Sequence, residues 1–323
     1  MPRATIDIGT NSVLLLIAEM QAQQLSPPLV GGDKGEGEPL QVIKDCARVS
    51  RLGEKLHQTS RFSEKAMDRT FQVLKDYKAL CDKQGVSHIE AVGTAAFRKS
   101  SNASEFIERV YNELKIKIRI ISGQEEAELS YHSITHDFGH LGPSVMALDI
   151  GGGSTELITQ VEEKTKSVSL NIGVVTLLEK FLKNDPPKFS EIKALQETLQ
   201  EQLKKDLTSF LKDRTSPARG RGPLEPQKGD GSPILVGLAG TVTTLSCVLQ
   251  KLPKWDPEKV FGTTLTQEDL TTLTQLFLAC TLEERKKLPG MAPERADTIV
   301  PGIILLQEMM KILKTDKILV SDR

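Results

Sequence analysis

Two short segments, far apart in the chain, each combine a carboxylate with glycines and hydroxyl side chains. They read Asp7-Ile8-Gly9-Thr10-Asn11-Ser12 and Asp149-Ile150-Gly151-Gly152-Gly153-Ser154-Thr155-Glu156. In each, the carboxylate ends an apolar, strand-like run, and the glycines let backbone N–H groups turn toward an anion because no Cβ is in the way. A third glycine-threonine loop follows at residues 237–241. We therefore predict phosphate binding by Gly9, Thr10, Asn11, Ser12, Gly151, Gly152, Gly153, Ser154, Gly240 and Thr241.

Two other interpretations of these turns have to be weighed. Either turn alone would be read more readily as an ordinary glycine hairpin, and only the three together favour phosphate. A dinucleotide-binding fold needs its glycine turn to open a helix, whereas strand-like residues follow both turns here.

Carboxylates beside such turns could hold a hard cation such as Mg²⁺, which takes oxygen ligands. Asp7 could instead simply hold its turn.

Strands and helices must position these turns. Residues 4–8 and 13–18 predict a buried hairpin about the first turn, and residues 145–150 and 156–160 predict a second one. Ser63, Asn102 and Ser122 are expected N-caps of helices that alternate with short strands. The repeated pattern of strand, Asp-Ile-Gly turn and strand indicates two similar α/β domains.

Composition narrows the class of protein. The 323 residues are enough for two domains, and 42 basic residues balance 43 acidic ones, which argues against nucleic acid or an anionic membrane as the partner. The four cysteines show no C-x-x-C pair, so neither a zinc site nor a disulfide framework is expected. No leader peptide or membrane span is recognisable, and a cytoplasmic location is expected.

The chain resembles the exopolyphosphatase and guanosine pentaphosphate phosphohydrolase (Ppx/GppA) family. The resemblance covers nearly the whole length, in the order Asp7–Ser12, Arg51–Gly53, Val92–Arg98, Ile121–Ala127, Asp149–Glu156, Gly240–Thr244 and Pro301-Gly302. It implies an α/β fold of two actin-like (ASKHA, ribonuclease H-like) domains flanking a cleft. We expect domain I at residues 1–122, with a C-terminal helix 302–323 returning to it, and domain II at residues 123–301. The chain is similar to the short form of the family, without the C-terminal HD-like domain.

The resemblance also implies roles for particular residues. The second glutamate of the S-G-x-E-E-A motif, Glu126, would be the general base. The spacing separates the two glutamates independently, because Glu125 falls at the third helical position, where it would close a capping box with Ser122. Glu126 stays available for chemistry, although Glu156 could share the base role. Arg98 matches the family's arginine for substrate phosphate, a role that suits a planar, two-pronged donor, though it could be an ordinary surface arginine.

These assignments lead to a predicted reaction. Asp149 and Glu156 match family residues associated with metal or water, and they would hold Mg²⁺ or Mn²⁺. The reaction would be metal-assisted attack of water on polyphosphate, releasing terminal orthophosphate. Guanosine pentaphosphate is the alternative substrate, and a kinase or an alarmone-binding protein of the same fold is a more distant alternative. We expect a homodimer that binds neither nucleic acid nor membrane.

Two further features carry weaker signals. His132, His136 and His140 recur every four residues and would lie on one helix face, but no catalytic glutamate follows His132 as in a metalloprotease. The basic stretch at residues 215–233 could gather a polyanion, but its proline and glycine content predicts a solvated loop.

Overall fold

The computed structural model describes residues 1–20, 40–138, 141, 145–161, 164–215 and 234–322. Its contacts divide the chain into two compact units, Met1–Ile121 and Ser122–Arg323. Residues 216–233 of the predicted basic loop and His140 lie outside the described residues. None of the described helices combines the length and the apolar character that crossing a membrane requires.

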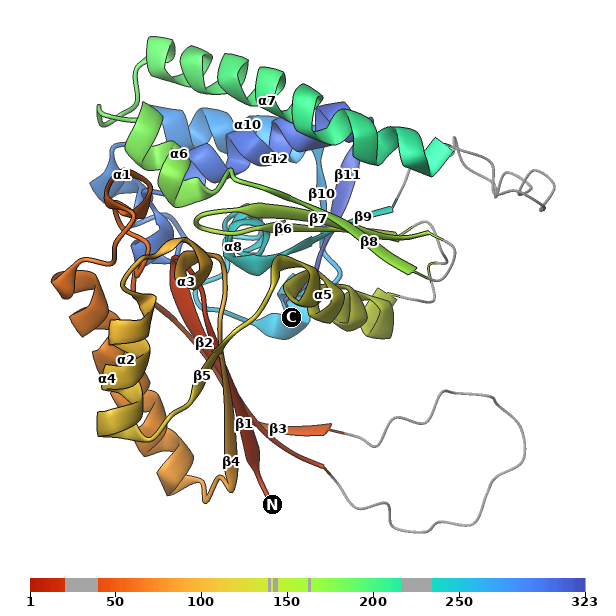
Figure 1. Ribbon diagram of the computed structural model, residues 1–323. Coiled ribbons are helices and arrows are strands. Elements are labelled where there is room, and N and C mark those ends of the chain that lie inside the picture. The colour runs from red at the N-terminus through yellow and green to blue at the C-terminus, as the bar shows by residue number, and fades with distance from the viewer. Residues whose placement is uncertain (21–39, 139–140, 142–144, 162–163, 216–233, 323) are drawn as a thin grey trace, which may run out of the picture. The chain divides into compact units, whose positions relative to one another are not determined.

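The first unit is a five-stranded sheet with helices packed on it (Figure 1). The strand order is β3-β2-β1-β4-β5, in which β1 and β2 form the antiparallel hairpin expected from sequence and β4 and β5 run parallel to β1. The elements are β1 (Arg3–Ile8), β2 (Ser12–Met20), β3 (Leu40–Val49), α1 (Leu56–Thr59), α2 (Glu64–Lys83), β4 (His88–Gly93), α3 (Ala95–Lys99), α4 (Ala103–Leu114) and β5 (Ile118–Ile120).

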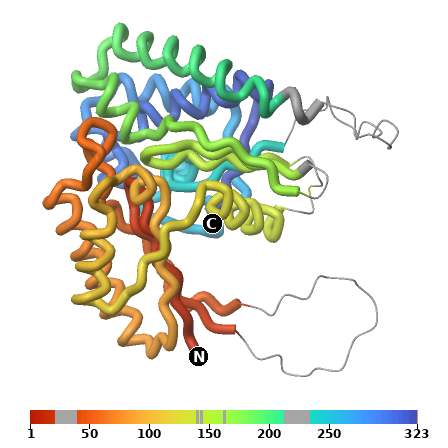
Figure 2. The backbone as a smooth tube through the Cα atoms, in the orientation of Figure 1, coloured from red at the N-terminus to blue at the C-terminus, as the bar shows by residue number. Residues whose placement is uncertain are grey.

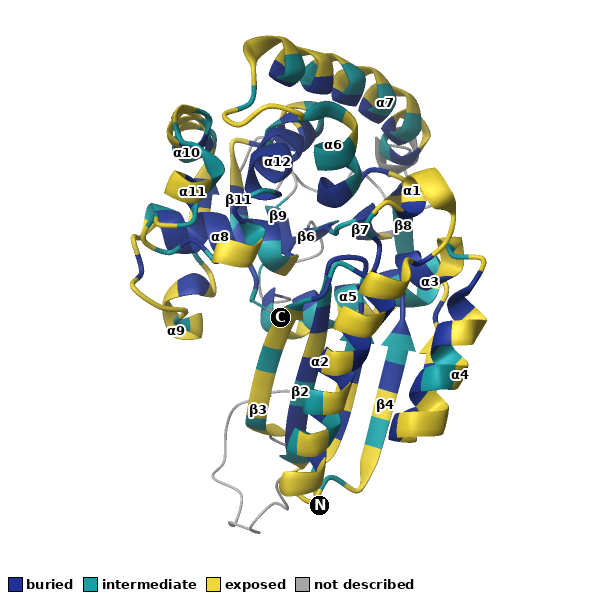
Figure 3. Ribbon diagram, turned by 90° about the vertical axis from the view of Figure 1, so that its left-hand side faces the viewer, coloured by how far each residue is buried: buried dark blue, intermediate teal, exposed yellow. Residues whose placement is uncertain are grey.

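Local sequence explains how the first unit's sheet and helices meet. Strand β1 alternates exposed and buried residues, so that one face of the sheet is apolar. Helix α2 begins at Ser63, whose hydroxyl accepts a hydrogen bond from the Ala66 N–H at 3.2 Å. Its inner side reaches β2, where the Tyr77 hydroxyl donates to the Val13 carbonyl at 3.1 Å. The outer side of α2 is exposed, as Figure 3 shows in yellow.

Asn102 does not cap its helix in the expected way. It is the residue before α4, but its side chain makes no capping hydrogen bond. Its carboxamide instead accepts from the Phe62 N–H at 2.8 Å and donates to the Phe62 carbonyl at 3.1 Å. Because Asn102 is buried, this pairing satisfies both ends of the amide inside the unit.

The second unit is built around a six-stranded sheet of order β10-β11-β9-β6-β7-β8. Strands β6 and β7 form the second expected hairpin, and β9 runs parallel to β6. The elements are α5 (Gly123–Phe138), β6 (Val145–Ile150), β7 (Thr155–Val161), β8 (Lys164–Leu170), α6 (Val174–Phe181), α7 (Phe189–Thr215), β9 (Ile234–Leu238), α8 (Ala239–Leu249), α9 (Pro257–Val260), β10 (Thr264–Thr266), α10 (Gln267–Ala279), α11 (Leu282–Arg285), the 3₁₀ helix η2 (Pro293–Arg295), α12 (Ile299–Leu313) and β11 (Lys317–Val320).

The strand order of the first sheet recurs in the second. Strands β8-β7-β6-β9-β11 repeat the order and directions of β3-β2-β1-β4-β5, and β10 is added antiparallel at the edge. In both sheets the central strand turns back through an Asp-Ile-Gly hairpin. The repeat confirms the predicted class, an α/β protein with two actin-like units.

The two faces of the second sheet carry different helices. Helix α5 packs on one face, where Ala127 and Ile134 contact a cluster that includes Ala147 and Ile158. Helices α6, α7, α8, α10 and α12 belong to the larger core that includes the opposite face (Figure 1). Burying a leucine contributes about 1.5–3 kcal/mol, and α7 presents four to this core at helical spacing. They are Leu195, Leu199, Leu203 and Leu207.

The expected return of residues 302–323 to the first domain is wrong. Helix α12 packs against α6, α7, α8 and α10, and β11 pairs with β9 and β10, all within the second unit. Figure 2 shows the blue C-terminal segment running beside the green α7. The physical reason is that α12 is apolar on nearly every side, so only the centre of a helical layer can bury it.

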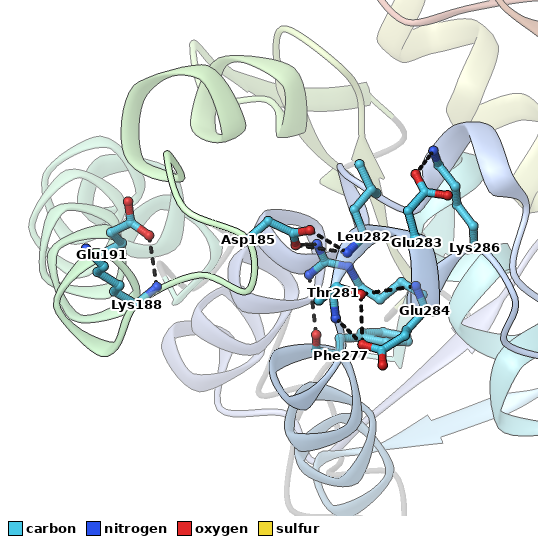
Figure 4. Close-up of polar contacts among 10 residues, drawn as sticks. Asp185, Lys188, Glu191, Phe277, Thr281, Leu282, Glu283, Glu284 and Lys286 are labelled. Carbon is cyan, nitrogen blue, oxygen red and sulfur yellow. Dashed lines mark hydrogen bonds and ion pairs between the residues drawn. The ribbon is translucent and has the colours of Figure 1, made fainter.

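An ion pair between the buried Arg285 and the partly exposed Asp185 joins two distant segments of this unit (Figure 4). Arg285, at the end of α11, donates from Nη2 to Asp185 Oδ1 at 2.9 Å and from Nη1 to the Phe277 carbonyl at 3.3 Å. Asp185 also accepts the Leu282 N–H at the start of α11. Burial lowers the pKa of the Arg285 guanidinium, because the charged form loses solvation, while the nearby Asp185 carboxylate opposes this.

Candidate functional site

The first glycine turn lies at the carboxyl edge of the first unit's sheet. It is closed by a hydrogen bond from the Gly9 N–H to the Ser12 carbonyl at 2.9 Å. Thr10 and Asn11 are buried. Strand β4 ends beside the turn, because Ile8 is in register with Gly93 of that parallel strand. Ligands of open α/β sheets commonly bind outside the carboxyl ends of strands, and this turn occupies such a position.

Arg98 lies at the same edge of the first unit. It belongs to α3, which begins two residues after β4 ends, and its side chain is exposed. Its Nη1 donates to the carbonyl of Ile121 at 2.9 Å. Gly93 permits the sharp entry to α3, since a Cβ there would lie 2.6 Å from the Phe97 ring. The structure thus places Arg98 near the end of the strand adjacent to β1, where the first turn begins.

The second glycine turn brings two carboxylates together. The Gly151 N–H donates to the Ser154 carbonyl at 3.0 Å, so the turn repeats the closure of the first. Asp149 and Glu156 are directly opposed on β6 and β7, and directly opposed residues of antiparallel strands point to the same face. Glu156 is only 4% exposed and accepts a hydrogen bond from the Ser169 hydroxyl at 2.7 Å.

Helix α5 brings Glu126 to this same face. Asp149 and Glu156 have the same strand parity as Ala147 and Ile158, which pack against α5. The start of α5 lies over strand β8 on this face. The Ser167 hydroxyl of β8 donates to Gln124 at 3.2 Å, and Ser167 is in register with Ile158 of β7. Glu126, half-buried in the first turn of α5, therefore shares a sheet face with both carboxylates.

The start of α5 resembles the expected cap. The Ser122 hydroxyl accepts the Glu125 N–H at 3.1 Å, which is one half of a capping box. The Glu126 N–H donates to the Ser122 carbonyl at 3.0 Å, so the backbone of Glu126 is already helical. The division of roles between the two glutamates stays a prediction.

Gly240 and Thr241 lie in the first turn of a helix rather than in the loop expected from sequence. Strand β9 ends at Leu238, and α8 begins at the next residue, Ala239, which has a left-handed φ of 65°. Leu238 is in register with Asp149 on the parallel strand β6. The start of α8 therefore lies at the same edge as Gly151–Ser154, and helix N-termini attract anions through their unpaired N–H groups and dipole.

The Pro301-Gly302 motif explains how this helix start is packed. Gly302 of α12 lies where an added Cβ would be 2.8 Å from Thr241 Cγ2 and 3.3 Å from Val174 Cγ1. A side chain at Gly302 would push on the first turns of both α8 and α6. The motif is therefore a close-packing element of the second unit.

Sequence reasoning missed Arg295. Its guanidinium covers Gly240, since a Cβ added there would lie 1.5 Å from Arg295 Nη1. Burial lowers the pKa of Arg295, while nearby Glu294 opposes this. An arginine over a helix N-terminus adds a second attraction for an anion. No local signal could have found Arg295, because it lies in the short 3₁₀ helix η2, 55 residues after Gly240.

The carboxylates of Asp149 and Glu156 suit a hard cation whose remaining ligands come from water and substrate. Among the described residues no group of three His, Cys, Asp or Glu side chains is arranged to hold a metal, and the described histidines of the predicted row, His132 and His136, form no such group. Asp149 and Glu156 supply two carboxylates on one face. Mg²⁺ commonly binds through one or two carboxylates and completes its shell with water and substrate phosphate oxygens.

Comparisons with known proteins show which family this chain resembles in sequence and in fold. A model of the Ppx/GppA phosphatase family matches residues 32–323. The chain is 34% identical to a bifunctional 3-dehydroquinate synthase/phosphatase of Fusobacterium nucleatum over 99% of its own length, but it spans only 45% of that relative. It is 32% identical to exopolyphosphatase 2 of Mycobacterium tuberculosis, covering 96% of this chain and 90% of the relative. The crystal structure of the Aquifex aeolicus Ppx/GppA family member superposes with a TM-score of 0.71 at 32% identity, covering 100% of this chain and 94% of that one. The chain therefore belongs to the Ppx/GppA phosphatase family.

Proposed function

We propose that this protein is an exopolyphosphatase, which releases terminal orthophosphate from inorganic polyphosphate by attack of water. The observation that carries the proposal is the common sheet face of Glu126, Asp149 and Glu156, at the edge where the second glycine turn and the start of α8 lie. The resemblance to exopolyphosphatase 2 of Mycobacterium tuberculosis supports the choice of substrate.

Glu126 acts as the general base in this proposal. A carboxylate in the first turn of α5 can accept a proton from water while the water attacks phosphorus. Glu156 is the less suitable base, because it is buried and one of its oxygens already accepts the Ser169 hydroxyl. General acid–base catalysis contributes about 10² to 10⁴ in rate, and the rest must come from positioning and charge neutralisation.

The proposed phosphate ligands are the first glycine turn and Arg98 in the first unit, and the second glycine turn and the start of α8 in the second unit. Their N–H groups and the guanidinium are fixed donors, which suits a reaction in which charge is spread over the phosphoryl oxygens. Asp149 and Glu156 would hold Mg²⁺ or Mn²⁺. When bound, the cation supplies charge neutralisation at the phosphate oxygens that two carboxylates cannot supply.

The test is orthophosphate release from long-chain polyphosphate and from guanosine pentaphosphate, measured side by side with Mg²⁺ present. The Glu126→Gln variant serves as the control for contaminating phosphatase. The proposal expects a higher kcat/KM for polyphosphate than for guanosine pentaphosphate, and the variant should lower it by about 10² to 10⁴. A higher kcat/KM for guanosine pentaphosphate would refute the choice of substrate, and equal activity of the variant would refute the site.

A further inference from the structure

Three carbonyl groups of the first glycine turn, those of Thr10, Asn11 and Ser12, accept backbone hydrogen bonds. The Ser12 carbonyl accepts the Gly9 N–H, the Asn11 carbonyl accepts the N–H groups of Ser50 and Arg51, and the Thr10 carbonyl accepts the Gly53 N–H, each at 2.9 Å. We call residues 50–53 the first brace. It is itself held by α2, where Arg69 Nε donates to the Ser50 carbonyl at 3.0 Å.

The second glycine turn has a brace of the same kind. The Ser154 carbonyl accepts the Gly151 N–H at 3.0 Å, the Gly151 carbonyl accepts the Val174 N–H at 3.0 Å, and the Gly152 carbonyl accepts the Val175 N–H at 2.9 Å. The second brace is therefore residues 173–175, where α6 begins. The two braces differ in structure, one being a loop and the other a helix start, but each engages two carbonyls of its own turn.

This arrangement has a direct electrostatic consequence. A carbonyl oxygen repels a phosphate, whereas an N–H group attracts it, so a turn binds phosphate best when its carbonyls point elsewhere. Hydrogen bonds from the N–H groups of the braces keep these turn carbonyls directed toward the braces. A brace that moves away would release carbonyl oxygens to rotate toward the bound anion.

Each brace contains a glycine pressed against its turn. A Cβ added to Gly173 would lie 2.4 Å from the backbone C and O of Gly152 and N of Gly153. Gly173 has φ −142° and ψ 159°, extended backbone that any residue adopts, so its need for glycine comes from the contact and not from its conformation. A Cβ added to Gly53 would lie 2.3 Å from Thr10 Cγ2.

We propose that Gly53 and Gly173 are positioning residues for phosphate binding, each allowing its brace to approach and bind the carbonyls of one glycine turn. The inference rests on the proposed function, which it deepens. Neither glycine contacts the phosphate in this proposal. Their effect should therefore appear in phosphate affinity, without loss of the fold.

The first experiment compares Gly173→Ala with wild type. We expect the KM for polyphosphate and the Kd for inorganic tripolyphosphate, measured by calorimetry, each to rise at least tenfold, while kcat falls less. Gly85→Ala is the matched control, because Gly85 has φ +64° and open space around it, so the substitution strains the backbone far from either turn. Unchanged KM and Kd in Gly173→Ala would overturn the proposal for the second turn.

The second experiment uses a rescue that the first brace allows. The atom that a Cβ at Gly53 would strike is a side-chain methyl, so Thr10→Ser removes the obstacle and keeps the hydroxyl. Gly53→Ala should weaken tripolyphosphate binding at least fivefold, and Gly53→Ala combined with Thr10→Ser should bind as well as Thr10→Ser alone. A double variant no better than Gly53→Ala would overturn the steric brace, and this arm stands even if Gly173→Ala fails to fold.

The outcomes separate the two proposals. A wild type that binds tripolyphosphate but does not hydrolyse polyphosphate removes the exopolyphosphatase assignment and leaves the braces testable by calorimetry. A wild type that binds no tripolyphosphate overturns both.

Discussion

Removing the Asp185 carboxylate should destabilise the second unit through a charge left buried. The Arg285 side chain is 5% exposed, and its Nη2 lies 2.9 Å from Asp185 Oδ1. In Asp185→Ala, Arg285 Nη1 still has the Phe277 carbonyl as an acceptor at 3.3 Å. Breaking a buried pair by removing one partner costs about 3–5 kcal/mol. Because the Asp185 side chain is 44% exposed, we expect the lower end, about 3 kcal/mol.

Urea unfolding of the wild type, Asp185→Ala, Arg285→Met and the double variant measures this loss in the free energy of unfolding. Arg285→Met removes the charge but keeps an apolar stem, so it should cost about 1 kcal/mol or less. Since no buried charge remains once Arg285 is replaced, Asp185→Ala combined with Arg285→Met should be less stable than Arg285→Met only by the lost hydrogen bond to the Leu282 N–H, about 1 kcal/mol. A coupling free energy near zero in this double-mutant cycle, or a larger loss for Arg285→Met than for Asp185→Ala, would refute the reasoning.

Three further predictions concern the proposed site and its surroundings. Glu126→Gln should lower kcat by about 10² to 10⁴ with KM nearly unchanged, whereas Glu125→Gln should cost only stability, about 1 kcal/mol or less; an inactive Glu125→Gln beside a normal Glu126→Gln would reverse the assignment. Activity should need Mg²⁺ or Mn²⁺, with Asp149→Asn and Glu156→Gln raising the concentration needed for half-maximal rate, and full turnover in excess chelator would contradict this. Burial raises the pKa of the Cys247 thiol to about 11, so at pH 8 its alkylation should be about 100-fold slower than that of an exposed cysteine. The free energy of unfolding should also fall as the pH rises from about 9 toward 11, because only the unfolded chain then gains by ionising this thiol; a Cys247→Ala variant with the same pH profile would refute the link.

Patterns along the chain were enough to predict the parts of this protein that local forces decide. Both Asp-Ile-Gly hairpins could be predicted because strand alternation and glycine turns are set within a few residues. Ser122 could be predicted as the cap of α5 because its hydrogen bond to the Glu125 N–H is local. The internal repeat indicated two similar units, and the repeated strand order bears this out.

Packing decided what local patterns could not. Glycine and threonine favour a loop by propensity, but residues 241–248 are all buried, and tertiary burial makes them a helix. The apolar character of α12 showed that it would be buried, but not in which unit. Arg295 meets Gly240, and Arg285 meets Asp185 across 100 residues, only because distant segments fold together. Glu126 shares a face with Asp149 and Glu156 because α5 covers that side of the sheet, and the choice of side depends on which apolar surfaces fit, a property of the whole unit.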